Sequence, residues 1–254
     1  MAVKLSARMS ALAALVTPGV RLADVGTDHG YIPVFLCQTG KIPSAIAMDV
    51  NGGPLQRAEA HVAESGLGDR IKTRLSDGLE KLEPGEADCV LIAGMGGALI
   101  QRILSEGEAV LRSVEELILQ PQSEVPRTRR FLREHGYRIV DEDMVEEDGK
   151  FYFLMKAHRM EADASELQSL EDEFGPVLLK KKHPVLLRWI RREIRILQMI
   201  RRKLLGAMYK TEDGQVMFFW PGEEGSAKQE RLSERLEETE KRLRLTEEAL
   251  KLLE

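Results

Sequence analysis

Residues 24–33 of this 254-residue chain read DVGTDHGYIP, and this segment decides the fold that we expect. It overlaps the end of the apolar run VRLADVG, which is typical of a short buried strand, and leads into the helix-like stretch YIPVFLCQTG. Gly26 follows the strand directly, and Gly30 comes just before the helix. A ligand approaches the backbone closely where Cβ atoms are missing, so the segment predicts a nucleotide-binding loop.

Acidic side chains in and beside this loop favour one kind of ligand. Asp28 stands where a G-x-G-x-x-G pyrophosphate loop has its middle glycine, and Asp24 lies inside the strand. Two carboxylates repel a pyrophosphate but attract the ammonium and sulfonium groups of S-adenosylmethionine. A metal held by Asp28 and His29 is another reading, but none of the five histidines pairs closely with another histidine or a cysteine. We therefore expect S-adenosylmethionine and no metal.

Polar residues also end the next strands along the chain. Asp49 ends the strand AIAMDV, where an acid either accepts hydrogen bonds from a ribose diol or makes an ordinary turn or cap. Asn51 either caps the following helix or contacts the cofactor. The third and fourth strands end in LSDG and AGMGG, at residues 75–78 and 93–97. The predicted cofactor-binding residues are Asp24, Gly26, Asp28, Gly30, Asp49, Asn51, Asp77, Gly78, Ala93, Gly94 and Met95.

The order of segments indicates two domains. Strand-like and helix-like segments alternate as in a parallel α/β sheet, until YRIVDEDMVEEDGKFYFLMKA forms two strands around the turn EEDG. The sheet is therefore expected to include an antiparallel last strand. Two later stretches carry apolar residues at spacings of three and four, which predicts an antiparallel helical hairpin. We predict an α/β domain over residues 1–159 and a helical, coiled-coil-like domain over residues 160–254.

The positive charge is concentrated in one segment. The net charge is −5, yet residues 180–204 hold ten lysines and arginines and one acid, Glu193. This favours contact with a polyanion such as RNA, although a merely solvated helix surface is the alternative. A second candidate patch consists of Arg127, Arg129, Arg130 and Arg133 on one helix. The predicted RNA-binding residues are Lys180, Lys181, Lys182, Arg188, Arg191, Arg192 and Arg195.

The remaining composition limits the class of protein. No apolar run approaches the ~20 residues that a membrane helix needs, and the N-terminal stretch shows no clear cleavage site. Cys37 and Cys89 lie in apolar segments and are expected to be plain buried thiols. We expect a cytoplasmic protein and a monomer.

The motifs DVGTDHGYIP, AMDVN, SDGL, AGMGG and ILQPQ, in this order, resemble those of class I methyltransferases. More narrowly, they resemble the bacterial tRNA (adenine-22-N1)-methyltransferase family, TrmK, over essentially the whole chain. The resemblance implies a seven-stranded Rossmann-like sheet whose last strand is antiparallel, and methylation of N1 of an adenine in tRNA. Asp28 departs from the general class I loop, but the narrower family shares it.

The chemistry of the target agrees with these motifs. Adenine N1 has an in-plane lone pair, so the enzyme mainly has to align the reacting groups. Enzymes that methylate exocyclic amines typically carry a D/N-P-P-Y/F motif, and AGMGG offers no such side chain. The candidates for the catalytic pocket are Asp28, His29 and Tyr31, with Met95 as an apolar wall. Tyr31 either stacks on a flipped base or packs in its helix, His29 either orients the base or merely starts that helix, and Asp28 contacts either cofactor or adenine.

Three other functions fit parts of the sequence. A class I methyltransferase acting on another RNA or a small molecule shares the fold, but the arginine-rich appendage favours RNA. A dinucleotide-dependent dehydrogenase lacks its middle glycine here. A non-catalytic coiled-coil scaffold does not need acids and glycines at four successive strand ends.

Overall fold

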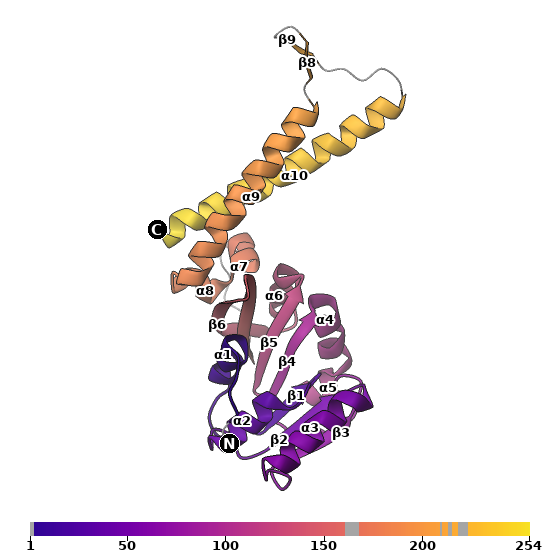
Figure 1. Cartoon of the computed structure of the whole chain (residues 1–254), viewed down its shortest axis with the longest axis vertical. Coiled ribbons are helices and arrows are strands. Elements are labelled where there is room, and N and C mark those ends of the chain that lie inside the picture. The colour runs from indigo at the N-terminus through magenta and orange to yellow at the C-terminus, as the bar shows by residue number, and fades with distance from the viewer. Residues whose placement is uncertain (1–2, 161–167, 209, 213–214, 218–222) are drawn as a thin grey trace. The chain divides into compact units, whose positions relative to one another are not determined.

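The computed structural model describes residues 3–160, 168–208, 210–212, 215–217 and 223–254 (Figure 1). The chain divides into two compact units, Met1–Lys180 and Lys181–Glu254. This division lies later in the chain than the one expected after residue 159. The reason is that two short helices, α7 (Gln168–Phe174) and α8 (Pro176–Lys180), contact the first unit.

The first unit contains a seven-stranded sheet in the order β3-β2-β1-β4-β5-β7-β6. Neighbours among the first five strands are parallel, and β7 runs antiparallel to both β5 and β6. The expected antiparallel last strand is thus confirmed. The strands are β1 (Leu22–Val25), β2 (Ala45–Asp49), β3 (Ile71–Leu75), β4 (Cys89–Gly96), β5 (Glu116–Ser123), β6 (Tyr137–Glu147) and β7 (Lys150–Arg159).

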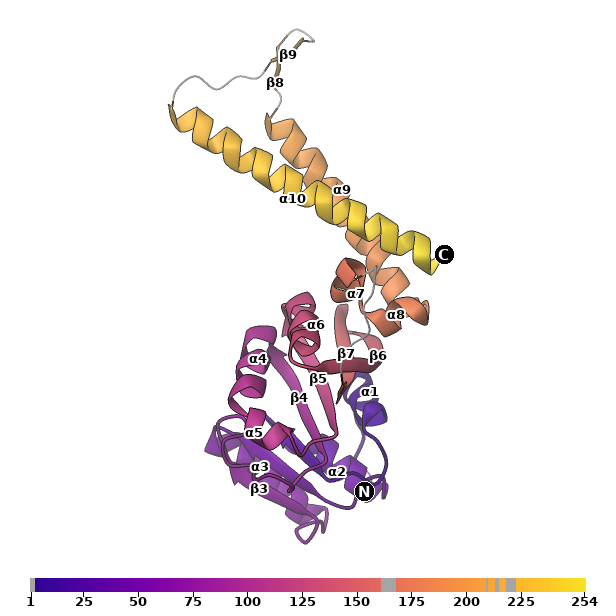
Figure 2. The same cartoon turned by 180° about the vertical axis from the view of Figure 1, so that it is seen from behind.

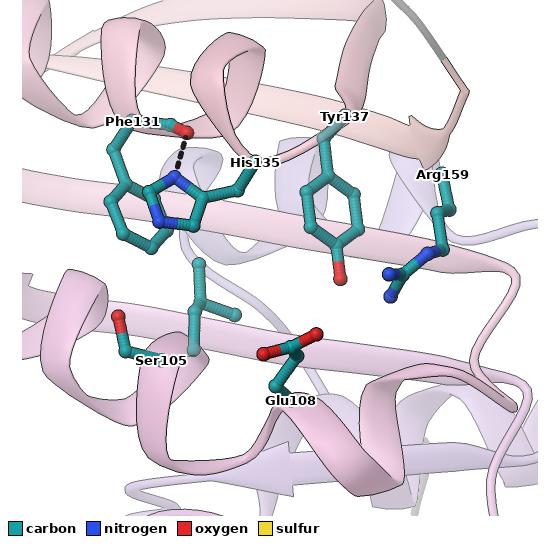
Figure 3. Close-up of a pocket in the computed structure, with 7 residues that line it drawn as sticks. Ser105, Glu108, Phe131, His135, Tyr137 and Arg159 are labelled. Carbon is teal, nitrogen blue, oxygen red and sulfur yellow. Dashed lines mark hydrogen bonds between the residues drawn. The ribbon is translucent and has the colours of Figure 1, made fainter.

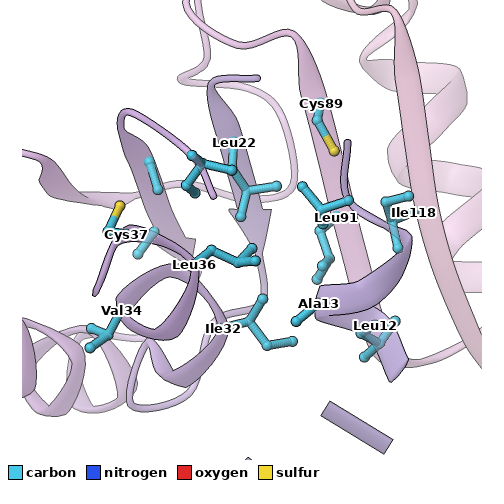
Figure 4. Close-up of a cluster of buried hydrophobic side chains, with 14 of the residues drawn as sticks. Leu12, Ala13, Leu22, Ile32, Val34, Leu36, Cys37, Cys89, Leu91 and Ile118 are labelled. Atoms are coloured by element: carbon cyan, nitrogen blue, oxygen red, sulfur yellow. The ribbon is translucent and has the colours of Figure 1, made fainter. Parts of the chain in front are cut away.

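Helices cover both faces of this sheet, which explains why the central strands β2 and β4 are mostly apolar, whereas the edge strands β3 and β6 carry charged residues (Figures 1 and 2). In β4, Cys89 and Leu91 join a core cluster with the first helices, whereas Val90 and Ile92 join a second cluster with the later ones. Figure 4 shows the first cluster. The helices of the first cluster are α1 (Ala7–Leu15), α2 (Tyr31–Gln38) and α3 (Gly52–Glu64), and those of the second are α4 (Gly97–Glu106), α5 (Glu108–Leu111) and α6 (Val125–Glu134).

The β6–β7 hairpin turns at Asp148 and Gly149, as the EEDG signal predicts. Both residues have positive φ angles, of 50° and 72°. A two-residue turn of this kind matches the twist of its flanking strands, and Gly149 adopts it without a Cβ penalty.

A buried ion pair attaches α7 and α8 to the sheet. Arg129 of α6 and Glu142 of β6 are almost fully buried, and Arg129 Nε donates to the Glu142 carboxylate at 3.0 Å. The same carboxylate accepts the backbone N–H of Val177 at the start of α8 at 2.9 Å. Arg129 also donates to the carbonyls of Asp172 and Glu173. Burial raises the pKa of Glu142, and Arg129 opposes that rise.

This cluster corrects part of the second candidate RNA patch. Arg129 is 2% exposed, so it is a structural residue and not part of a surface. Arg130 and Arg133 both pair with the carboxylate of Asp172 in α7. Arg129, Arg130 and Arg133 of α6 therefore attach the segment of α7 and α8 to the sheet.

The second unit contains two long helices that pack against each other, α9 (Pro184–Met208) and α10 (Glu223–Leu253) (Figures 1 and 2). Arg191 near the start of α9 pairs with Glu254, and Arg201 further along pairs with Glu240, so the helices are antiparallel. Thr246 lies buried in the apolar stripe because its hydroxyl donates to the Arg242 carbonyl. The described residues between these helices include β8 (Lys210–Glu212) and β9 (Gln215–Met217).

No helix in the described part of the chain is long and apolar enough to cross a bilayer.

Candidate cofactor and target site

The glycine loop lies at the carboxyl edge of the sheet, between β1 and α2. The N–H groups of Gly26 and Thr27 both donate to the carbonyl of Met48 in the neighbouring strand, at 2.8 and 2.9 Å. Gly26 has a φ of +76°, and an added Cβ would lie 2.1 Å from Met95 Cε. The loop therefore needs glycine, and its backbone lies directly against the end of β4.

Asp24 is a buried acid below this loop. The residue is 6% exposed, and its carboxylate accepts the Thr27 hydroxyl at 2.7 Å. Burial, and to a smaller extent the nearby Asp49 carboxylate, raises the pKa of Asp24 to about 6, while the Thr27 hydrogen bond opposes the rise. A cation bound here would stabilise the charged form. The site thus suits a ligand with an ammonium or sulfonium group.

Asp49 and Asp77 follow the neighbouring strands at the same edge. The Asp49 carboxylate accepts the N–H of Asn51 at 2.7 Å, and its carbonyl accepts the N–H of Ser76. Asn51 precedes α3, but its side chain makes no capping hydrogen bond within the described chain. The Asp77 carboxylate is half exposed and pairs with Arg102 at 3.1 Å. The structure thus brings the loops after β1, β2 and β3 together.

The glycines of AGMGG have different structural roles. The register between β4 and β5 shifts around Met95, and Gly94 has a φ of +77°. A Cβ on Gly97 would lie 2.6 Å from the Ser123 carbonyl, so Gly97 allows α4 to start close to β5. Ala93, Gly94 and Met95 are half-buried at the end of β4, beside Gly26.

Two of the three candidates for the catalytic pocket, Asp28 and His29, lie in the loop itself, and Tyr31 starts α2 directly after it. The His29 ring stacks on Tyr31 with a centroid distance of 5.3 Å, and Tyr31 is 36% exposed. His29 has a φ of 60°, which is uncommon for a residue with a side chain. Asp28 points its carboxylate outward and pairs with Arg57 of α3 at 2.8 Å.

Two residues of α3 that support this loop were missed by sequence analysis. His61 contacts the Tyr31 ring edge-on at 5.1 Å, and its Nδ1 lies 2.8 Å from the His29 carbonyl. Arg57, one turn earlier, holds Asp28. The i, i+4 spacing of Arg57 and His61 on a helix that follows the Asp49 strand is the signal that could have identified them.

The predicted RNA-binding residues are all exposed. Lys180 ends α8 in the first unit, and Lys181 and Lys182 precede α9 in the second. Part of the charge of α9 is balanced by α10, since Arg191 pairs with Glu254 at 3.0 Å. The four arginines of the set, Arg188, Arg191, Arg192 and Arg195, all lie on α9.

Cys37 and Cys89 are buried free thiols, as expected, and burial raises the pKa of both. Among the described residues, no group of three His, Cys, Asp or Glu side chains is arranged to hold a metal ion.

A separate pocket lies at the opposite edge of the sheet (Figure 3). Tyr137 begins β6 and Arg159 ends the antiparallel β7, so both mark the edge at which the parallel strands start. The Arg159 guanidinium lies over the Tyr137 ring at 5.7 Å, and burial raises the pKa of Tyr137. None of the predicted site residues lines this pocket, which therefore is distinct from the glycine-loop site.

Comparison with known proteins relates this geometry to a family. The family model for TrmK, tRNA (adenine(22)-N(1))-methyltransferase, matches residues 22–240. The tRNA (adenine(22)-N(1))-methyltransferase of Bacillus subtilis strain 168 is 40% identical over 200 residues, which cover 78% of this chain and 84% of the relative. The crystal structure of the B. subtilis m1A22 tRNA methyltransferase TrmK has a TM-score of 0.78 and 34% identity, covering 98% and 99% of the two chains. A Streptococcus pneumoniae protein crystallised with S-adenosyl-L-methionine has a TM-score of 0.76 and 33% identity, covering 97% and 100%.

Proposed function

The chain belongs to the TrmK family of tRNA (adenine(22)-N(1))-methyltransferases, and from this premise we infer what its loops and helices do. It is an enzyme that uses S-adenosylmethionine to methylate N1 of adenine 22 in tRNA. We propose that this activity lies at the carboxyl edge of the sheet, and the observation that supports this is the buried Asp24 below the glycine loop, with Asp49 close enough to raise its pKa.

We propose that the acids of three loops hold the cofactor, which supplies an electrophilic methyl group on a cationic sulfur. Asp24 and the glycine loop face its positive charge, with the Cβ-free backbone of Gly26 allowing close approach. Asp49 accepts hydrogen bonds from the ribose hydroxyls. Asp77 accepts a hydrogen bond from the adenine amino group of the cofactor. To do so it gives up its ion pair with Arg102, which is exposed and therefore contributes at most about 1 kcal/mol.

We propose that the target adenine lies between the His29–Tyr31 stack and Met95. Tyr31 is exposed enough to offer its ring face to a flipped base, and His61 fixes its orientation from the side. The half-buried Met95 provides an apolar wall next to Gly26. The protein needs no general base to activate N1, because the ring nitrogen carries a free lone pair; it needs to exclude water and hold the base in line.

We propose that the second unit binds tRNA, since its basic helix offers exposed lysines and arginines to phosphates. Residues 181–254 form this RNA-binding part, and residues 1–180 form the catalytic part. We further propose that the protein lies in the cytoplasm, because its substrate is tRNA. We propose that it is a monomer, because one chain carries both the catalytic and the RNA-binding part.

The decisive test is the position of the modification. The purified chain is incubated with labelled S-adenosylmethionine and an unmodified tRNA transcript, and the product is sequenced and its nucleosides are analysed. We expect 1-methyladenosine at position 22, and no incorporation into a matched transcript with guanine there. Methyl on N6, or at another position, would contradict the proposed target.

A further inference from the structure

Several arginines reach the carboxyl edge of the sheet, and most are neutralised by acids. Arg57 pairs with Asp28, and Arg102 pairs with Asp77. Arg8 of α1 differs, because within the described part of the chain no carboxylate lies within ion-pair distance of its guanidinium. Its positive charge is therefore available to an external anion.

The surroundings of Arg8 hold the guanidinium in place without cancelling its charge. Its Nη1 donates to Oε1 of Gln120 in β5 at 2.9 Å, and its guanidinium lies over the Tyr152 ring at 5.2 Å. Gln120 is fully buried, and its Nε2 has no hydrogen-bond partner among the described residues. A neutral amide and an aromatic face orient an arginine, but only a carboxylate would neutralise it.

The start of α1 is also fixed, which restricts where Arg8 can point. Ser6 caps the helix by accepting the Met9 N–H, and its hydroxyl donates to Glu147. Glu147 accepts the backbone N–H of Arg8 at 3.2 Å, and the Arg8 charge is the last of the causes that lower the pKa of Glu147, so this acid attracts the guanidinium without a direct ion pair. Arg8 is consequently half-buried and preorganised.

The position of Arg8 relates it to the target side of the site. A Cβ on Gly94 would lie 3.8 Å from Arg8 Nη1, so the guanidinium is next to the end of β4. Gln120 and Tyr152 belong to β5 and β7, on one side of β4, whereas the proposed cofactor acids Asp24, Asp49 and Asp77 lie in or directly after β1, β2 and β3 on the other side. Arg8 therefore lies beside the end of β4, on the side of that strand away from the proposed cofactor acids.

We propose that Arg8 is a positioning residue that binds a backbone phosphate of the tRNA next to the target adenosine. A guanidinium donates parallel hydrogen bonds to phosphate oxygens, and Arg8 retains N–H groups for this purpose. The proposal rests on the tRNA methylation proposed above. The carboxylate of the cofactor is the other anion near this edge, and the experiment separates it from a phosphate.

The test compares Arg8→Gln with Arg112→Gln, a matched control that removes an exposed arginine paired with Glu108 on α5. For Arg8→Gln we expect the KM for tRNA to rise about tenfold, as loss of a charge-assisted contact does, while affinity for S-adenosylmethionine stays within about twofold. The plot of log tRNA affinity against log salt concentration should become less steep, by the amount that corresponds to the loss of about one phosphate contact. The control should change none of these.

Gln120→Glu is the second variant, and it keeps the oxygen that accepts from Arg8 while adding a neutralising carboxylate. We expect it to raise the KM for tRNA in the same direction, with kcat changed less. Weaker cofactor binding with an unchanged KM for tRNA would assign Arg8 to the cofactor carboxylate and overturn the proposal. Unchanged KM and salt slope in folded variants would also overturn it. Failure of the wild-type chain to methylate adenine 22 would instead refute the proposed function itself.

Discussion

Arg129 and Arg8 lie in the same unit, and each donates a hydrogen bond to a side-chain oxygen. They differ in the charge of that partner. Arg129 is 2% exposed and is balanced by Glu142 and two backbone carbonyls. Arg8 is half-buried and receives a neutral amide. The comparison teaches that a buried charge paired with a carboxylate stabilises a junction, whereas a charge held by a neutral amide is suited to bind a ligand.

The largest effect is expected at the buried ion pair of Arg129 and Glu142. Glu142→Ala leaves Arg129 buried without its counter-charge, and it should lower the free energy of unfolding by about 3–5 kcal/mol. Denaturant unfolding followed by circular dichroism measures this loss. Replacing both partners, in Arg129→Met with Glu142→Leu, should recover much of it. A single variant as stable as the parent chain would mean that the pair does not hold α7 and α8 in place.

Asp24 lies between these extremes, because it is buried but lacks a cationic partner in the described chain. Its pKa in the folded state, about 6, exceeds the ordinary value of 3.8, so the folded state binds the proton more tightly. Its contribution to stability is complete below about pH 4 and is lost as the pH rises through 6, by up to about 3 kcal/mol. Asp24→Asn should flatten this part of the stability curve, as measured by unfolding at each pH.

The same carboxyl links cofactor binding to pH. A cationic ligand favours the ionised form, so affinity for S-adenosylmethionine should increase between about pH 5 and 7 and then level off. Calorimetry in buffers of different ionisation enthalpy would detect the released proton. If Asp24→Asn retained the full pH dependence, the titrating group would be another residue.

Asp49→Ala should have a smaller effect, confined to the ligand. Loss of hydrogen bonds to a charged acceptor should weaken S-adenosylmethionine binding by about 1.5–3 kcal/mol in calorimetry. Asp69→Ala is the matched control, since Asp69 is exposed on the loop before β3. Equal affinities for the two variants would remove Asp49 from the ribose role.

The basic helix should show the smallest effect for each residue. Changing Arg191, Arg192 and Arg195 to Glu should weaken tRNA binding about tenfold, in a gel-shift assay at fixed salt, and leave cofactor binding unchanged. A control with the same charge reversal on α10 uses three exposed arginines, Arg231, Arg235 and Arg244. If both triple variants lost the same affinity, the loss would reflect total charge and not a site on α9.

The sheet could be predicted from sequence because its signals are local. Apolar strands, glycine turns and the EEDG hairpin each occupy only a few consecutive residues, and each strand is followed by glycines or acids that mark the next loop. The glycine loop and its acids could be predicted as a site for the same reason. Asp24 and Gly26 can be recognised because they lie in or directly after an apolar strand. Met95 lies against Gly26 because β1 and β4, whose ends carry these residues, are neighbours in the sheet.

Pairings across long separations could not be predicted in this way. Arg129 looks like a surface residue in a helix of arginines, and only the approach of Glu142 and α7 shows that it is buried. The compact units divide after Lys180 for that reason, since α7 and α8 carry no strand or heptad signal of their own. Arg8 was missed because its partners, Gln120 and Tyr152, come from distant strands.

The two buried thiols have a practical consequence for studying this enzyme. Cys37 and Cys89 are shielded and their pKa values are raised, so alkylating reagents, which react with thiolates, should modify them slowly. A cysteine introduced at an exposed position such as Arg244 would then be the preferred attachment point for a fluorophore. Docking of tRNA could be followed in real time on an otherwise native chain.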